Sequence, residues 1–178
     1  MRIYVGSGAL LKRVFAEAES AALLSALSGY LDEDASLVSS SLAWVEVSRA
    51  VGTAAVGDTT LRVEGLTDTA LSGIRLQPIS AEVVALARRL TPPTLRSLGS
   101  IHLASALLID ADLLIAYDQR LLEAAQHHGL PVGSTMGCRS ARRPETRPPH
   151  ASRRQPQESC TCPKVVAPHC PGDESGIG

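Results

Sequence analysis

The first 136 residues of this 178-residue chain contain no cysteine, because all four cysteines lie in the last 42 residues. Disulfide bonds and cysteine-ligated zinc are therefore excluded from the larger part of the chain. Long apolar runs are also missing, since no segment approaches the roughly 18 apolar residues of a membrane-spanning helix. The N-terminal segment lacks the basic stretch, apolar core and cleavage site of an export signal. We expect a cytoplasmic protein that does not enter the membrane.

Residues 1–136 also have no excess of positive charge. Residues 1–136 hold 10 Lys and Arg against 14 Asp and Glu, a net charge of −4, whereas residues 137–178 have a net charge of +3. An acidic surface argues against broad electrostatic binding of nucleic acid. It does not exclude chemistry at a metal site, where carboxylates gather and the metal in turn recruits a phosphate group.

Strand-like and helix-like segments alternate through residues 1–135. We expect short strands at residues 2–5, 37–39, 74–78, 112–116 and 130–133. We expect helices at residues 10–15, 20–31, 42–51, 59–71, 81–90, 97–108 and 120–128. Strands separated by helices form right-handed crossovers, which place a parallel sheet between two helical layers. The expected fold class is therefore a three-layer α/β/α domain with a short parallel central sheet.

Several residues mark the expected ends of these helices. Ser41 and Ser80 are plausible N-caps of the helices that follow them, because serine side chains accept hydrogen bonds from free backbone amides. The Pro92-Pro93 pair is expected to stop the helix before it. Gly129 is expected to close the last helix.

The composition changes after Met136. Residues 137–178 hold 7 of the 11 prolines and only three of the larger aliphatic residues. Such a segment cannot bury enough apolar surface to order itself. We expect a folded domain at residues 1–135, followed by a disordered Pro/Arg-rich tail at residues 136–178.

The tail contains four soft metal ligands, Cys160, Cys162, His169 and Cys170. Structural zinc sites usually have two to four residues between paired cysteines and a small fold around them. A Cys-x-Cys pair among prolines is poor geometry for zinc, so we expect no zinc site.

Candidate functional residues lie where the expected strands end, because ligands of open parallel sheets bind beyond the carboxyl ends of the strands. Gly6 follows the first strand and Gly99 lies in the first turn of the helix at residues 97–108. Glu46 lies one turn into the helix after the second strand, and Asp118 comes directly after the apolar stretch at residues 113–117. Two of these four positions carry carboxylates.

Four sequence blocks resemble the PIN-domain nucleases found in VapC-like toxins. They read IYVGSGAL at residues 3–10, SSSLAWVEVSRA at 39–50, LRSLGSIHLASA at 95–106 and ADLLIAYDQRL at 111–121. In that family the first block has an aspartate at the position of Gly6, and the third reads L-x-x-x-D-A-I-H-L-A-x-A, with an aspartate at the position of Gly99. The second and fourth blocks carry acids at Glu46 and Asp118. The blocks occur in the family's order and cover essentially all of residues 1–135.

The resemblance implies a PIN-like fold and a metal-dependent endoribonuclease toxin. In that family four acids converge on Mg²⁺ or Mn²⁺, and the metal polarises a phosphoryl oxygen while a bound water becomes the nucleophile. It thus implies Glu46 and Asp118 as catalytic residues and metal ligands, Mg²⁺ (or Mn²⁺) as cofactor, and structured RNA such as tRNA or rRNA as substrate. Gly6 and Gly99 offer no side-chain ligand, so we expect impaired hydrolysis.

The resemblance also implies protein partners, namely a cognate antitoxin and a second copy of the chain in a homodimer. The helical regions at residues 10–31 and 42–71 supply apolar surface for such partners. An alternative function is therefore a catalytically inactive toxin-like domain that binds an antitoxin and self-associates.

Other roles stay open for five residues. Glu46 is alternatively a solvated helix residue, and Asp118 an N-cap, a role compatible with metal binding. His102 is expected to be a packed or capping histidine and not a ligand. Arg96 is either a surface residue or a phosphate contact. Ser7 either forms a hydrogen bond near the metal or caps the first helix.

Overall fold

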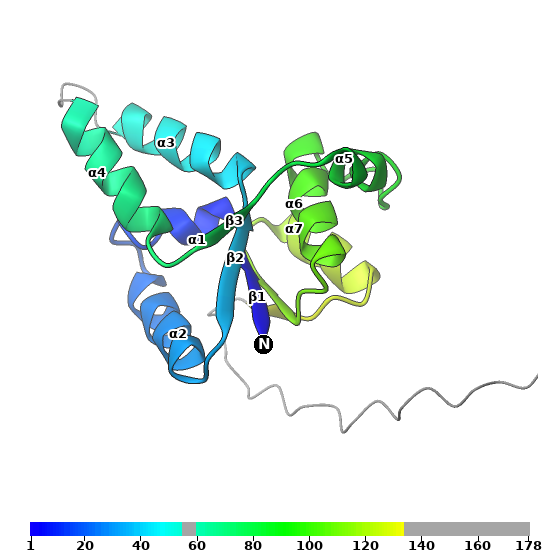
Figure 1. Ribbon diagram of the computed structural model, residues 1–178, viewed down its shortest axis with the longest axis horizontal. Coiled ribbons are helices and arrows are strands. Elements are labelled where there is room, and N and C mark those ends of the chain that lie inside the picture. Colours follow the sequence, from blue (N-terminus) through cyan, green and yellow to red (C-terminus); the bar gives the residue numbers. More distant parts are fainter. Residues whose placement is uncertain (55–59, 134–178) are drawn as a thin grey trace, which may run out of the picture. The chain divides into compact units, whose positions relative to one another are not determined.

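The computed structural model describes residues 1–54 and 60–133. Strands and helices alternate along these residues, as Figure 1 shows. The strands are β1 (Arg2–Val5), β2 (Ser36–Ser40), β3 (Arg75–Gln77), β4 (Leu113–Ile115) and β5 (Val132–Gly133). The helices are α1 (Ser7–Leu11), α2 (Ser20–Asp32), α3 (Leu42–Ala54), α4 (Thr60–Leu71), α5 (Ala81–Ala87), α6 (Ser97–Leu108) and α7 (Gln119–His127).

The five strands form one parallel sheet in the order β3-β2-β1-β4-β5. Ile3 of the central strand β1 pairs with Leu37 of β2 on one side and with Leu113 of β4 on the other. The chain therefore runs outward from β1 through β2 to β3, and then crosses back to β4 and β5. The direction of winding reverses between β1 and β4, which is where ligands of open α/β sheets bind.

Alternate side chains of the central strands enter two different cores. Ile3 and Val5 of β1 and Ile115 of β4 pack with buried residues of α1 to α4, whereas Tyr4 and Leu114 pack with α6 and α7. Figure 1 shows α1 to α4 on one side of the sheet and α5 to α7 on the other. A parallel sheet covered on both faces favours apolar strands, and the central strands β1 and β4 are apolar over most of their length. The predicted three-layer α/β/α fold is confirmed.

The prediction of a first helix at residues 10–15 is wrong in position. Helix α1 begins at Ser7, and Gly6 is its N-cap residue, with φ −72° and ψ 157°. The amides of Ala9 and Leu10 both donate to the carbonyl oxygen of Gly6, at 3.0 and 3.2 Å. The Gly6-Ser7-Gly8 segment is therefore the start of a helix and not a loop. The strand passes directly into the helix.

One of the two predicted serine caps is correct. The hydroxyl of Ser80 accepts from the amide of Val83 at 3.3 Å, as expected for the N-cap of α5. Before α3, by contrast, the amide of Leu42 donates to the hydroxyl of Ser40 at 3.2 Å, in place of the predicted Ser41. Ser40 ends a strand, and its side chain thus joins β2 to the following helix.

Two further helix ends differ in part from the prediction. Helix α5 ends at Ala87, before the predicted end at residue 90 and well ahead of the prolines. Helix α7 ends at His127, and Gly129 follows with φ +75°, the left-handed conformation that favours glycine. No helix within residues 1–54 and 60–133 is long and apolar enough to cross a membrane. Residue 59 and the tail, with its candidate zinc ligands, lie outside the described residues.

Candidate functional site

A pocket of about 520 Å³ lies at the carboxyl ends of β1 and β4, where the sheet reverses its winding. Gly6, Glu46, Gly99 and Asp118 all line it. These residues come from the exit of β1, a position one turn into α3, the first turn of α6 and the exit of β4. The structure therefore brings together the four positions that the strand ends and the sequence blocks point to.

The two glycines of the pocket have ordinary backbone conformations but little room for a side chain. Neither has a positive φ, so neither is strained against an L-residue. A Cβ atom at Gly6 would lie 3.3 Å from the Cβ of Ala116, and one at Gly99 would lie 2.8 Å from Cδ1 of Leu95. The first contact requires a shift of a few tenths of an ångström. The second requires the flexible end of Leu95 to turn, so an aspartate fits at either position only after a local adjustment.

Glu46 is partly buried and paired. Its Oε2 lies 2.6 Å from Nε2 of His102, and its side chain is 23% exposed. Burial raises the pKa of the Glu46 carboxyl, but side-chain hydrogen bonds from His102 and Ser7 outweigh it, so the net pKa lies below the usual value. Glu46 is therefore ionised at neutral pH and is not a solvated helix residue. Ser7 contacts this carboxylate and makes no capping hydrogen bond for α1.

Asp118 is the N-cap residue of α7. Its Oδ1 accepts hydrogen bonds from the amides of Arg120 and Leu121, at 2.9 and 3.4 Å. The capping role left open by the sequence is thus present. The same exposed carboxylate lines the pocket, and the cap does not use its other oxygen, Oδ2.

His102 connects the pocket to the core, which the sequence did not indicate. The side chain is buried, as expected, but both ring nitrogens have partners: Nδ1 lies 2.7 Å from the Tyr4 hydroxyl and Nε2 contacts Glu46. The sequence could have placed His102 near the pocket, because Gly99 and His102 are three residues apart on one helix and therefore share a face.

Two ribonucleases of Mycobacterium tuberculosis are similar to this chain, although no protein-family model matches it. Ribonuclease VapC47 of strain CDC 1551 / Oshkosh is 33% identical over 134 residues, which are 74% of this chain and 96% of the relative. Ribonuclease VapC46 of strain H37Rv is 38% identical over 135 residues, which are 73% and 95% of the two chains. The chain belongs to the VapC ribonuclease family.

The fold of this VapC-family chain also resembles a solved structure, that of VapBC2 from Rickettsia felis bound to a DNA fragment from their promoter. The TM-score is 0.57, over 75% of this chain and 98% of the other. At 12% sequence identity the likeness concerns the fold alone. The PIN-like α/β/α architecture expected from the sequence blocks is thereby confirmed.

VapC ribonucleases generally depend on a divalent metal. No group of three or more His, Cys, Asp or Glu side chains in the described ranges is arranged to hold a metal ion. Glu46 and Asp118 supply carboxylates to the pocket, and Gly6 and Gly99 supply none. Mg²⁺ prefers an octahedral shell of oxygen ligands, of which these two carboxylates could supply a part.

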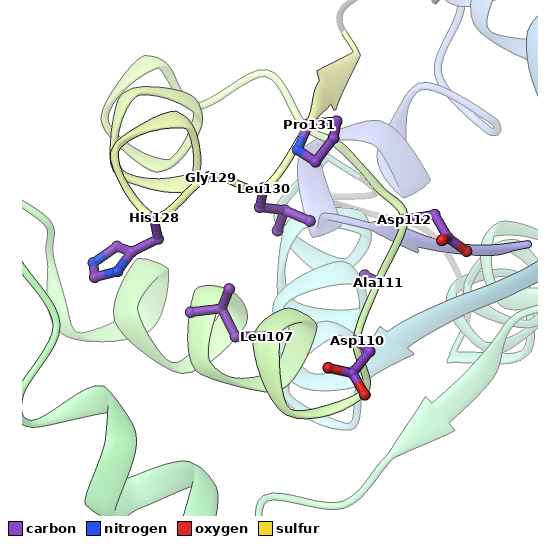
Figure 2. Close-up of a pocket in the computed structure, with 8 residues that line it drawn as sticks. All are labelled: Leu107, Asp110, Ala111, Asp112, His128, Gly129, Leu130 and Pro131. Carbon is purple, nitrogen blue, oxygen red and sulfur yellow. The ribbon is translucent and has the colours of Figure 1, made fainter. Parts of the chain in front are cut away.

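A second pocket, of about 300 Å³, lies near the amino-terminal ends of β4 and β5 (Figure 2). It contains Asp110, Asp112 and His128, which Figure 2 shows pointing in different directions. Asp112 accepts from the Arg2 amide at 2.6 Å, and Nε2 of His128 lies 2.9 Å from the Thr91 carbonyl oxygen. Two of these polar groups are thus engaged within the chain, and the three do not converge. The pocket at the carboxyl ends of the strands is the candidate site of this VapC protein.

Proposed function

We propose that the chain is a VapC-type toxin of a toxin–antitoxin pair whose metal-dependent endoribonuclease activity is impaired. Its similarity to two VapC ribonucleases supports the activity class. The observation that carries the impairment is the lining of one pocket by Gly6, Glu46, Gly99 and Asp118, of which only two bear a carboxylate. Residues that act as one catalytic unit lose most of their effect when part of the unit is missing.

The remaining carboxylates support weak binding of Mg²⁺ or Mn²⁺. Glu46 is ionised and held at the pocket wall by His102, and Asp118 keeps one oxygen outside its helix cap. Both metals prefer oxygen ligands and retain several waters, so two carboxylates and a phosphate group form a partial shell. With two acids missing, a hydrolytic water has lost groups that would position it.

Structured RNA such as tRNA or rRNA is the proposed substrate class. Arg96 is exposed, occupies the N-cap position of α6 and lines the same pocket as the two carboxylates. A guanidinium group in this place suits a phosphate contact, because its planar fork donates two parallel hydrogen bonds. This single cation offsets part of the negative charge of Glu46 and Asp118.

A cognate antitoxin and a second copy of the chain are the proposed protein partners. Trp44 and Val45 of α3 are each 56% exposed, and Leu24 and Leu31 of α2 are exposed as well. These residues lie in the two helical regions expected to carry apolar surface. The alternative function, a catalytically inactive domain that binds an antitoxin, uses the same surface. Both functions place the protein in the cytoplasm.

The proposal is tested by restoring the two missing carboxylates. We expect Gly6→Asp combined with Gly99→Asp to raise Mg²⁺-dependent cleavage of RNA by about 100-fold or more, and neither single variant to recover it fully. The matched control is Gly6→Ala combined with Gly99→Ala, which adds both Cβ atoms without a carboxylate. It experiences the same contacts with Ala116 and Leu95 and should stay inactive.

Two results would contradict the proposal in different ways. An unmodified chain that already cleaves RNA as fast as the double aspartate variant shows that the catalytic ligands are assigned wrongly. A double aspartate variant that folds, as judged by circular dichroism, and yet shows no activity favours the inactive binding domain.

A further inference from the structure

A chain of hydrogen bonds runs from the protein core to the pocket. The backbone amide of Ser40 donates to the Tyr4 hydroxyl oxygen at 3.0 Å, and that hydroxyl lies 2.7 Å from Nδ1 of His102. Nε2 of His102 lies 2.6 Å from Oε2 of Glu46, which lines the pocket. The chain joins β2, β1, α6 and α3, elements that are far apart in the sequence.

The inner members of this chain are fully enclosed. Tyr4 is 0% and His102 3% exposed. Burying a hydroxyl and an imidazole is unfavourable unless each finds hydrogen-bond partners, and here every polar atom of the two side chains has one. An apolar residue at either position would serve packing alone. The geometry of such a polar chain is instead suited to holding its outer end, Glu46, in one place.

The hydrogens of the chain can be assigned from its partners. Burial raises the pKa of the Tyr4 phenol, so Tyr4 keeps its hydrogen. Its oxygen already accepts from the Ser40 amide at 3.0 Å, and the Ser39 and Ser105 hydroxyls also lie near it. Nδ1 of His102 is 2.7 Å from the hydroxyl, and we assign the Tyr4 hydrogen to this short contact. If Nδ1 accepts this hydrogen, the ring hydrogen is on Nε2. That N–H donates to Glu46.

We propose that Tyr4 and His102 are positioning residues of the pocket: Tyr4 holds His102 as the Nε2–H tautomer, and that N–H fixes the Glu46 carboxylate. In metalloproteins, residues that form hydrogen bonds to a metal ligand hold that ligand in its orientation. Their loss weakens metal binding 10–100-fold. The inference rests on the proposed function in one respect only, the use of Glu46 as a ligand in the pocket.

The first test reads the tautomer directly in the unmodified protein. Two-bond ¹⁵N–¹H NMR spectra at pH 7.5 distinguish the protonated nitrogens of a histidine ring. We expect the Nε2–H pattern for His102, and we expect Tyr4→Phe, which removes the donor to Nδ1, to shift the ring away from it. An Nδ1–H tautomer or a doubly protonated ring in the unmodified chain overturns the inference.

The second test separates positioning from packing with two substitutions of similar size. The amide of His102→Gln can occupy the place of Nε2 and donate to Glu46, whereas His102→Asn reaches only the place of Nδ1. With Mn²⁺ alone as the probe, line broadening of pocket NMR signals should give His102→Gln an affinity within about threefold of the unmodified chain. His102→Asn should bind at least about 10-fold more weakly.

The outcomes of the two tests are distinguishable. Equal Mn²⁺ binding by His102→Asn and the unmodified chain overturns the positioning role. An unmodified chain that binds no Mn²⁺ refutes the proposed metal ligands, and the tautomer spectra then still decide whether Tyr4 and His102 hold Glu46.

Discussion

At the scale of single residues, Asp118 has two roles that different substitutions separate. Asparagine caps a helix about as well as aspartate, so Asp118→Asn should change the free energy of unfolding by less than about 0.5 kcal/mol. Asp118→Ala removes the acceptor of the Arg120 and Leu121 amides and should cost about 1 kcal/mol. Both variants lose the pocket carboxylate, so both should weaken Mn²⁺ binding. Thermal unfolding and calorimetric titration measure the two effects, and micromolar Mn²⁺ affinity that survives Asp118→Asn with Glu46→Gln would contradict the metal role.

Individual residues also show how much of the site could be predicted from the sequence. Gly6 and Asp118 follow short apolar strands, and a parallel sheet brings such exits to one edge, so their proximity was predictable. The pairing of His102 with Glu46 was not, because it depends on how α3 and α6 pack across β1. Nor does a pattern of apolar residues reveal that Tyr4, in the middle of a buried strand, would hold that histidine in place.

At the scale of elements, a glycine after a helix and a glycine within a helix test how backbone conformation affects stability. Gly129 follows α7 with φ +75°, where a side chain costs about 1 kcal/mol, so Gly129→Ala should destabilise the protein by that amount. Gly29 lies within α2, is exposed, and has open space around its Cβ position. Gly29→Ala should therefore stabilise the protein by about 0.5–1 kcal/mol. Denaturant titration compares the two, and an equal response would show that backbone conformation does not govern them.

The ends of elements were the least predictable part of the fold. Residues 97–108 form a helix with the predicted limits, because their apolar pattern is long and continuous. Helix α1 has only five residues and begins at the strand exit, held by amides that donate to the Gly6 carbonyl. Gly6 and Gly8 flank Ser7, and glycines favour a loop over a helix. In the folded protein the packing of Ala9 and Leu10 in the core outweighs this preference.

At the scale of the whole molecule, the described residues form one sheet with a core on each face. The sheet ends with β5, and the buried residues of both cores lie between Ile3 and Leu130. The alternation of Ile3, Tyr4 and Val5 between those cores is why the short apolar strands at the centre of the sheet indicated a covered parallel sheet. The same distribution of apolar residues is the reason for the prediction that the folded domain ends near residue 135.

The domain limit leads to a prediction about truncation. A chain that ends at Met136 keeps β5 and every buried residue of both cores, so its melting temperature should match that of the full chain within about 1 °C. Removing residues 131–178 also deletes β5 and the Pro131 carbonyl that accepts from the Leu114 amide at 2.8 Å. We expect this shorter control to lose about 2 kcal/mol, or roughly 5–10 °C. Calorimetry compares the three chains at equal concentration. Unfolding or aggregation of the chain that ends at Met136 would mean that the proline-rich segment contributes to the stability of the fold, because the same sheet and cores would then be insufficient without it.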